Sequence, residues 1–302
     1  MSESSTFSRR LTNLWFGLCL GDPGLPDAIQ RLGYRPIWVE LPFPNSSLET
    51  VCPDLIVSSA AQDHAVLFEW KSGANSNEDQ LRHYADIADA DLARRASISP
   101  PPSAHCVAMA GKSDHVARLT LGMRNVGSEF PLLATTDAGL ELVENGFHSR
   151  AIAAVFDPVL KIDWDLVPSQ YLPIDGEAEP WEYAEQVLPR IFEYIGERRL
   201  GFMVDELCSD ICPFTWSRLG PPGQDAIRAR TGELLADISR RELNEFVSFD
   251  KGRRRATFNN NPYDLPFGQQ GAAVRRLQTA HRRLMARMTS AAEGVEQLEL
   301  DL

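Results

Sequence analysis

Two short apolar runs with charged residues at matching ends constrain the fold of this chain more than any other feature. Each run is rich in β-branched or aromatic residues, and the two strands they predict cover Asp54–Ser59 and Ala65–Trp70. Asp54 opens the first strand, whereas Glu69 and Lys71 close the second. If the two strands pair as neighbours, both carboxylates and the amine meet at one end of the sheet.

This combination of charges predicts a particular chemistry. Two fixed carboxylates hold a hard, oxygen-seeking cation such as Mg²⁺. A lysine beside them can orient a water molecule or help to deprotonate it. Asp54, Glu69 and Lys71 are therefore candidate catalytic residues for phosphodiester hydrolysis.

The first half of the chain predicts an α/β domain over residues 1–165. Helices and strands follow one another in the order helix, three strands, helix, strand. Besides the two strands above, the patterns predict these elements: helix Asp27–Leu32, strand Pro36–Leu41, helix Asn77–Ala96, strand His105–Ala110 and a further strand at Leu132–Thr135.

The second half is predicted to be mainly helical. A proline-rich stretch over residues 166–182 indicates a linker, followed by a domain over residues 183–292 and a tail over residues 293–302. The elements expected in that domain are helices Trp181–Glu197, Gly201–Ile211, Phe214–Leu219, Gln224–Arg241 and Gly271–Ala292, and a hairpin over Glu245–Phe258. Three helices followed by a basic hairpin resemble a winged helix-turn-helix.

The charged residues of the first domain also match a known motif. Pro53-Asp54, a gap of fourteen residues and Glu69-Trp70-Lys71 resemble the signature of the PD-(D/E)XK nuclease superfamily. Gln80-x-x-x-Tyr84 resembles the mark of the subgroup that includes the RecB nuclease domain, lambda exonuclease and the Cas4 proteins. The resemblance covers roughly residues 20–115.

The resemblance implies a restriction-endonuclease-like core and a role for each residue of the motif. Asp54, Glu69 and the Trp70 carbonyl would bind Mg²⁺, with Mn²⁺ as the alternative ion, and Lys71 would contact the attacking water or the scissile phosphate. Gln80 and Tyr84 would position the site and the nucleic-acid backbone. Relatives often add an acid from the first helix, for which Asp27 and Glu40 are candidates.

The distribution of charge indicates where nucleic acid could bind. The chain carries a net charge of −12, yet Arg218–Arg287 contains fourteen Lys/Arg and seven Asp/Glu. Arg253, Arg254 and Arg255 on the expected hairpin could neutralise phosphates. The arginines of the last helix could bind the backbone or remain solvated. A winged helix can also contact protein, so both partners stay open.

The last residues, Gln297-Leu298-Glu299-Leu300-Asp301-Leu302, resemble the hexapeptide with which bacterial proteins bind the replication sliding clamp. Gln297, Leu298, Leu300 and Leu302 would be the contact residues. The motif is short and degenerate, so a chance match is the main alternative.

The composition excludes several classes of protein. No apolar run is long enough for a membrane span, and the N-terminus lacks the order of a secretory signal, so a cytoplasmic location is expected. Five scattered cysteines do not predict a disulfide framework.

The resulting hypothesis is a Mg²⁺-dependent deoxyribonuclease in repair, recombination or anti-phage defence. The alternatives are a non-catalytic DNA-binding or regulatory protein on a nuclease scaffold and an RNA-cleaving defence effector. The catalytic residues do not separate DNA from RNA, and homo-oligomerisation is also left open.

Overall fold

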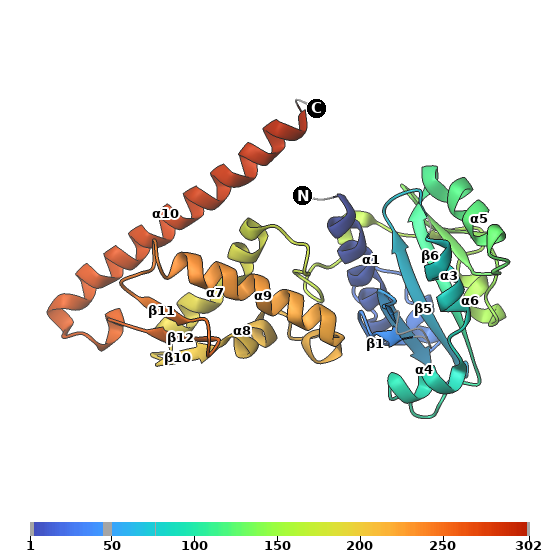
Figure 1. The fold of residues 1–302 in the computed structure, drawn as a ribbon, viewed down its shortest axis with the longest axis horizontal. Coiled ribbons are helices and arrows are strands. Elements are labelled where there is room, and N and C mark those ends of the chain that lie inside the picture. The colour runs from blue at the N-terminus through green and yellow to red at the C-terminus, as the bar shows by residue number, and fades with distance from the viewer. Residues whose placement is uncertain (1–2, 45–49, 76, 301–302) are drawn as a thin grey trace. The chain divides into compact units, whose positions relative to one another are not determined.

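The computed structural model describes residues 3–44, 50–75 and 77–300, with side chains for 6–44, 50–75 and 77–290 (Figure 1). The chain divides into two compact units. Unit 1 comprises Met1–Leu172 and Ser217–Gly223, and unit 2 comprises Pro173–Trp216 and Gln224–Leu302. The first boundary lies within the stretch interpreted as a linker. Ser217–Gly223, by contrast, belongs to unit 1, although the sequence analysis placed it in the C-terminal domain.

Unit 1 is built on a seven-stranded mixed sheet in the order β1-β4-β5-β6-β7-β8-β9. The strands are β1 (Arg35–Trp38), β4 (Leu55–Ser59), β5 (His64–Lys71), β6 (Ala104–Lys112), β7 (Leu132–Thr136), β8 (Gly139–Glu144) and β9 (Leu160–Lys161). Strands β5, β6 and β7 run parallel, whereas β4 lies antiparallel between β1 and β5. A separate two-stranded hairpin joins β2 (Phe43–Pro44) to β3 (Thr50–Val51). The expected α/β class is confirmed.

Helices cover both faces of this sheet (Figure 1). They are α1 (Glu3–Leu20), α2 (Ala28–Arg31), α3 (Glu78–Ala85), α4 (Asp89–Arg95), α5 (Val116–Asn125) and α6 (Arg150–Val155), with short 3-10 turns η1 (Ser113–His115) and η2 (Trp164–Leu166). On one face, the Trp15 ring of α1 lies 4.1 Å from that of Phe68 on β5. On the other, Leu81 of α3 and Leu119 of α5 pack with Leu67 and Met109 of the sheet. Strand β5 is buried between these two layers.

The structure adds elements to unit 1 that the sequence analysis did not predict, and it divides one that was predicted. Helix α1 was missed, although Leu11, Leu14, Trp15 and Leu18 repeat at helical spacing and are buried. Helix α5 and strands β8 and β9 were also missed. The single helix expected over residues 77–96 is two helices, α3 and α4. The second begins with an acidic turn, which favours a helix N-terminus because of the helix dipole.

Unit 2 combines four helices with a small sheet. Its elements are α7 (Pro180–Gly196), β10 (Gly201–Met203), α8 (Val204–Ile211), α9 (Pro221–Ile238), β11 (Val247–Asp250), β12 (Arg255–Phe258), η4 (Pro262–Asp264) and α10 (Phe267–Leu300), while η3 (Trp216–Arg218) lies at the boundary. Residues 201–203, expected as helix, form β10 because they pair with β12 in a sheet of order β10-β12-β11. Helix α10 also extends beyond the predicted end at Ala292.

The core of unit 2 lies between its sheet and helices α7 and α10. Phe202 of β10 packs against Tyr194 of α7 and Phe258 of β12. Leu277 and Leu284 bury one side of α10, because residues seven apart fall on the same face of a helix. No helix among the residues that the structure describes is long and apolar enough to cross a membrane.

Candidate active site

The pairing of β4 with β5 brings the predicted acidic residues to one end of the sheet. Leu55 lies opposite Phe68, so Asp54, directly before β4, comes next to the end of β5. Glu69 and Lys71 share one face of β5, because side chains alternate along a strand. Trp70 takes the opposite face, where its indole Nε1 donates a hydrogen bond of 3.0 Å to Thr12 Oγ1 of α1.

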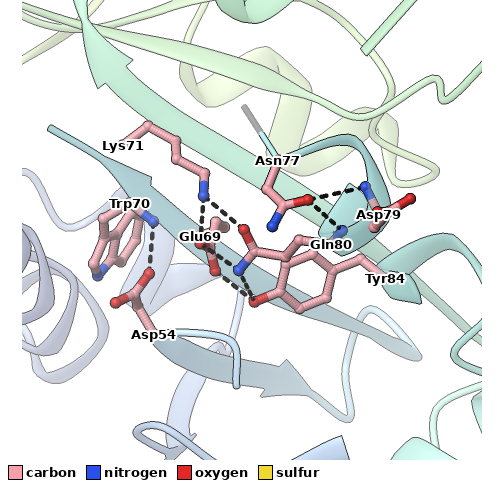
Figure 2. Close-up of polar contacts among 8 residues, drawn as sticks. All are labelled: Asp54, Glu69, Trp70, Lys71, Asn77, Asp79, Gln80 and Tyr84. Atoms are coloured by element: carbon pink, nitrogen blue, oxygen red, sulfur yellow. Dashed lines mark hydrogen bonds and ion pairs between the residues drawn. The ribbon is translucent and has the colours of Figure 1, made fainter. Parts of the chain in front are cut away.

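Glu69 is the centre of a hydrogen-bonded network (Figure 2). Its Oε1 accepts from Lys71 Nζ at 2.7 Å and from Gln80 Nε2 at 3.0 Å. Its Oε2 accepts from the Tyr84 hydroxyl at 2.5 Å. Lys71 Nζ also donates to Gln80 Oε1 at 2.9 Å, which closes a ring of three side chains. These hydrogen bonds hold Glu69 in one orientation. They also satisfy a carboxylate on a residue that is only 6% exposed.

Helix α3 positions two members of this network. Asn77 caps the helix, because its Oδ1 accepts from the backbone N–H groups of Asp79 and Gln80. The cap fixes the first turn, and Tyr84 follows Gln80 by four residues on the same face. The predicted helix began at Asn77, which an Asn directly before two acidic residues favours, but its role as the cap was not assigned from the sequence.

Asp54 lies beside the network, and no Lys, Arg or His among the described residues forms an ion pair with it. Its Oδ2 accepts from the Trp70 backbone N–H at 2.7 Å. No hydrogen bond from the part of the chain that the structure describes reaches its other carboxylate oxygen. Burial, followed by the negative charge of Glu69, raises the pKa of Asp54 well above its usual value. Burial and the Glu69 charge raise the pKa of Tyr84 as well, so its phenol keeps the proton that it donates.

The arrangement can be tested against the expected divalent cation. Residues 3–44, 50–75 and 77–300 contain no group of three or more His, Cys, Asp or Glu side chains that could hold a metal ion. Mg²⁺, however, is commonly bound through one or two carboxylates, with waters as its remaining ligands. Asp54 and Glu69 fit that mode, because a cation would offset the repulsion between them. The Trp70 carbonyl stays a predicted ligand.

Of the two candidates for a third acid, Glu40 is nearer to the site. Its charge contributes to the raised pKa of Asp54, after the larger effects of burial and Glu69. Its Oε2 also lies 2.5 Å from the position that a Cβ on Gly223 would occupy, so glycine makes room for the carboxylate. Asp27 instead forms an exposed ion pair of 3.0 Å with Arg31.

The other predicted binding residues belong to unit 2 or to the chain end. Arg253 and Arg254 lie in the turn between β11 and β12, Arg255 opens β12, and all three are exposed. The Arg253 backbone N–H donates to Asp250 Oδ1 at 3.0 Å, which braces the turn. The side chains of Gln297, Leu298 and Leu300, and the whole of Leu302, lie outside the described residues, so the clamp-binding hypothesis stays a prediction.

Comparison with known proteins places this site within one matched segment. Residues 8–103 match the family model of the MJECL32 domain. That segment contains the Glu69 network and Asp54 but none of unit 2. No curated protein and no solved structure matches the chain. The chemistry of the site therefore has to be argued from its own geometry.

Proposed function

We propose that the protein is a Mg²⁺-dependent nuclease with a PD-(D/E)XK core that hydrolyses phosphodiester bonds, with DNA as the expected substrate. The observation that carries the proposal is the meeting of Asp54 with the Glu69–Lys71 ion pair at one end of two paired strands. If the Glu69–Lys71 ion pair were only structural, nothing would require the Asp54 carboxyl beside it. Burial and the Glu69 charge disfavour the ionisation of Asp54, and perturbed carboxyl groups of this kind cluster at functional sites.

The order of elements around the site supports this proposal. Helix α1, strands β1, β4 and β5, helix α3 and strand β6 follow in the order that the PD-(D/E)XK resemblance implies. Gln80 and Tyr84 both contact Glu69, as expected if they position the site. The fold alone would not establish an activity, because one fold supports many functions.

The residues divide the work of hydrolysis among them. Asp54 and Glu69 would hold the cation, which supplies Lewis-acid stabilisation of a phosphate and lowers the pKa of a bound water. Lys71 carries three N–H donors, of which Glu69 and Gln80 accept two. The third N–H is available to orient a water or a phosphate oxygen. Gln80 and Tyr84 act as positioning residues for the Glu69 carboxylate, to which both donate, and their contact with the nucleic-acid backbone stays a prediction.

Unit 2 would serve as an accessory domain. The order α7, β10, α8, α9, β11, β12 is that of a winged helix, with the turn between β11 and β12 as the wing. Such modules bind DNA or protein. Repair, recombination and anti-phage defence are settings in which a nuclease with this accessory domain could act.

Cleavage assays with labelled single- and double-stranded DNA and RNA test the proposal, each with Mg²⁺, Mn²⁺ or EDTA. We expect cleavage that EDTA abolishes. Lys71→Met and Asp54→Asn should each lower the rate about 100-fold or more, the usual scale for losing a group that acts in proton transfer or metal activation. Lys161→Met and Asp86→Asn are matched controls, since both residues are exposed and lie outside the network.

Two results would contradict this function. Cleavage that survives in both site variants would show that the activity arises elsewhere. Binding of nucleic acid by the wild type and both variants, with no cleavage under any ion, would favour the non-catalytic binding protein. Cleavage of RNA but not DNA would favour the defence effector.

A further inference from the structure

Unit 2 contains an open groove of about 740 Å³ on the side of α10 that faces the turn after α9. One wall comes from the residues that follow α9, and the other from the first half of α10. Its polar lining consists of four arginines, two acidic residues and two uncharged residues: Arg241, Arg275, Arg276, Arg283, Glu242, Glu245, Asn244 and Thr279. The described part of α10 up to Ser290 contains five arginines and no acidic residue, so the groove has a basic wall.

The acidic residues around this groove already have partners. Arg276 Nε lies 2.8 Å from Glu245 Oε1. Arg287 binds Glu242 at 2.6 Å and Asp237 at 2.7 Å. The acidic side chains beside the groove are therefore neutralised by these ion pairs, and the remaining arginines give the groove an excess of positive charge.

Of the four arginines that line the groove, Arg276 pairs with Glu245 and Arg241 with Asp237, whereas Arg275 and Arg283 have no such partner among the described residues. Both are exposed and line the groove, and no acidic side chain among those described lies within ion-pair distance of either. They stand eight residues apart on one helix, a rise of ~12 Å. That rise is close to the axial length of three to four successive phosphates in one strand of duplex DNA.

Helix α9, which would be the DNA-reading helix of a winged helix, offers no such charge. Its two arginines are outnumbered by Asp225, Glu233 and Asp237. Arg228 pairs with Asp205 at 2.6 Å and with Asp225 at 2.7 Å, and its guanidinium lies over the Trp216 ring. Arg230 lies 3.5 Å from Glu233. The positive charge of α9 is therefore already neutralised within unit 2.

We infer that unit 2 binds the phosphate backbone of nucleic acid in the groove lined by Arg275 and Arg283, and not through α9. Guanidinium groups bind phosphate oxygens in a bidentate manner, and Asn244 adds an uncharged donor of the kind that contacts phosphates. An acidic protein partner fits less well. The groove has no exposed aromatic anchor, since its Phe246 is 2% exposed, and such anchors dominate protein interfaces.

This inference rests on the proposed function only in taking nucleic acid as the ligand. It is tested by measuring binding under conditions that prevent cleavage. Fluorescence anisotropy would follow full-length Lys71→Met protein binding to labelled duplex and single-stranded oligonucleotides in EDTA. In that background, Arg275→Gln with Arg283→Gln should weaken duplex binding about tenfold or more. The slope of log K against log salt should fall by ~1.8, for two lost phosphate contacts.

The control is Arg190→Gln with Arg230→Gln, which removes the same charge from arginines that pair with Glu193 and Glu233. The control should bind within about twofold of the parent. The inference is overturned if the groove variant binds like the parent, or if the control loses as much affinity. It is also overturned if the groove variant changes only self-association, which would make a carboxylate-bearing copy of the chain the occupant.

The two proposals fail separately in these assays. If the groove variant loses binding and the wild-type protein cleaves nothing with any ion, the groove binds nucleic acid but the protein is not a nuclease. Cleavage by wild-type protein with unchanged binding in the groove variant would do the reverse.

Discussion

The hydroxyl of Tyr84 provides a test of the Glu69 network that does not depend on catalysis. Tyr84 is 1% exposed, and its hydroxyl donates to Glu69 Oε2 at 2.5 Å. Tyr84→Phe removes this oxygen and leaves the ring in place, so little cavity is created. A hydrogen bond to a charged group contributes about 1.5–3 kcal/mol to stability. We therefore expect Tyr84→Phe to lower the free energy of unfolding of unit 1 by about 2 kcal/mol.

The charge of Glu69 is what makes this bond strong, and a double-mutant cycle isolates that contribution. With a neutral acceptor, a hydrogen bond contributes only about 0.5–1.5 kcal/mol. Tyr84→Phe should thus cost about 1 kcal/mol less in a Glu69→Gln background than in the wild type. Gln80 Nε2, 3.5 Å from the hydroxyl, is too distant to account for the difference.

The effect in unit 1 alone can be measured by denaturing the protein with urea in EDTA and monitoring unfolding by hydrogen exchange of peptides from β5. The loss of about 2 kcal/mol corresponds to a fall in Tm of ~4–8 °C for a domain of this size. Tyr263→Phe, a partly exposed tyrosine of unit 2, should change stability by less than about 0.5 kcal/mol. A Tyr84→Phe cost below that value, or an equal cost in both Glu69 backgrounds, would refute the network as described.

Three further outcomes follow from the structure. Free Mg²⁺ at ten times its Kd should stabilise the wild type by about 1.4 kcal/mol, and Asp54→Asn but not Asp86→Asn should abolish the shift in a thermal melt. Burial and nearby histidines lower the pKa of His64 to about 4, so stability should decline as pH falls below about 6.5, by up to about 3 kcal/mol near pH 4. His64→Gln should flatten that part of the pH–stability curve, and an unchanged curve would contradict the assignment. Leu284→Ala, at a fully buried position of α10, should cost unit 2 about 2–5 kcal/mol in denaturant unfolding; a cost below about 1 kcal/mol would mean that α10 does not pack as described.

The strands that carry the site could be predicted because their signals are local. Short apolar runs flanked by polar residues defined β4 and β5 to within two residues, and the period of two placed Glu69 and Lys71 on one face. Helix α1 was missed, although its signal is local as well. Its apolar residues Leu11, Leu14, Trp15 and Leu18 repeat at helical spacing, but no helix was predicted from them.

Other elements could not be predicted because their partners are distant in the sequence. Gly201–Met203 becomes a strand only through its pairing with Arg255–Thr257, more than fifty residues later. The division of residues 77–96 into α3 and α4 occurs without Gly or Pro at the break. Strand pairing overrides local helix propensity at Gly201–Met203, whereas the only local signal for the break before α4 is its acidic first turn.

The sequence by itself determined which acidic and basic groups stand at the ends of β4 and β5, because the order and alternation of residues along a strand are properties of the chain. Only the tertiary structure decided how those groups are used. It ties Glu69 to Lys71, Gln80 and Tyr84, whereas the hydrogen bond that Asp54 accepts comes from the Trp70 backbone N–H. It also neutralises Arg228 of α9 while leaving Arg275 exposed, although the two residues look alike in the sequence. The physical reason is that the strength of a charge depends on its neighbours in space, and packing chooses those neighbours.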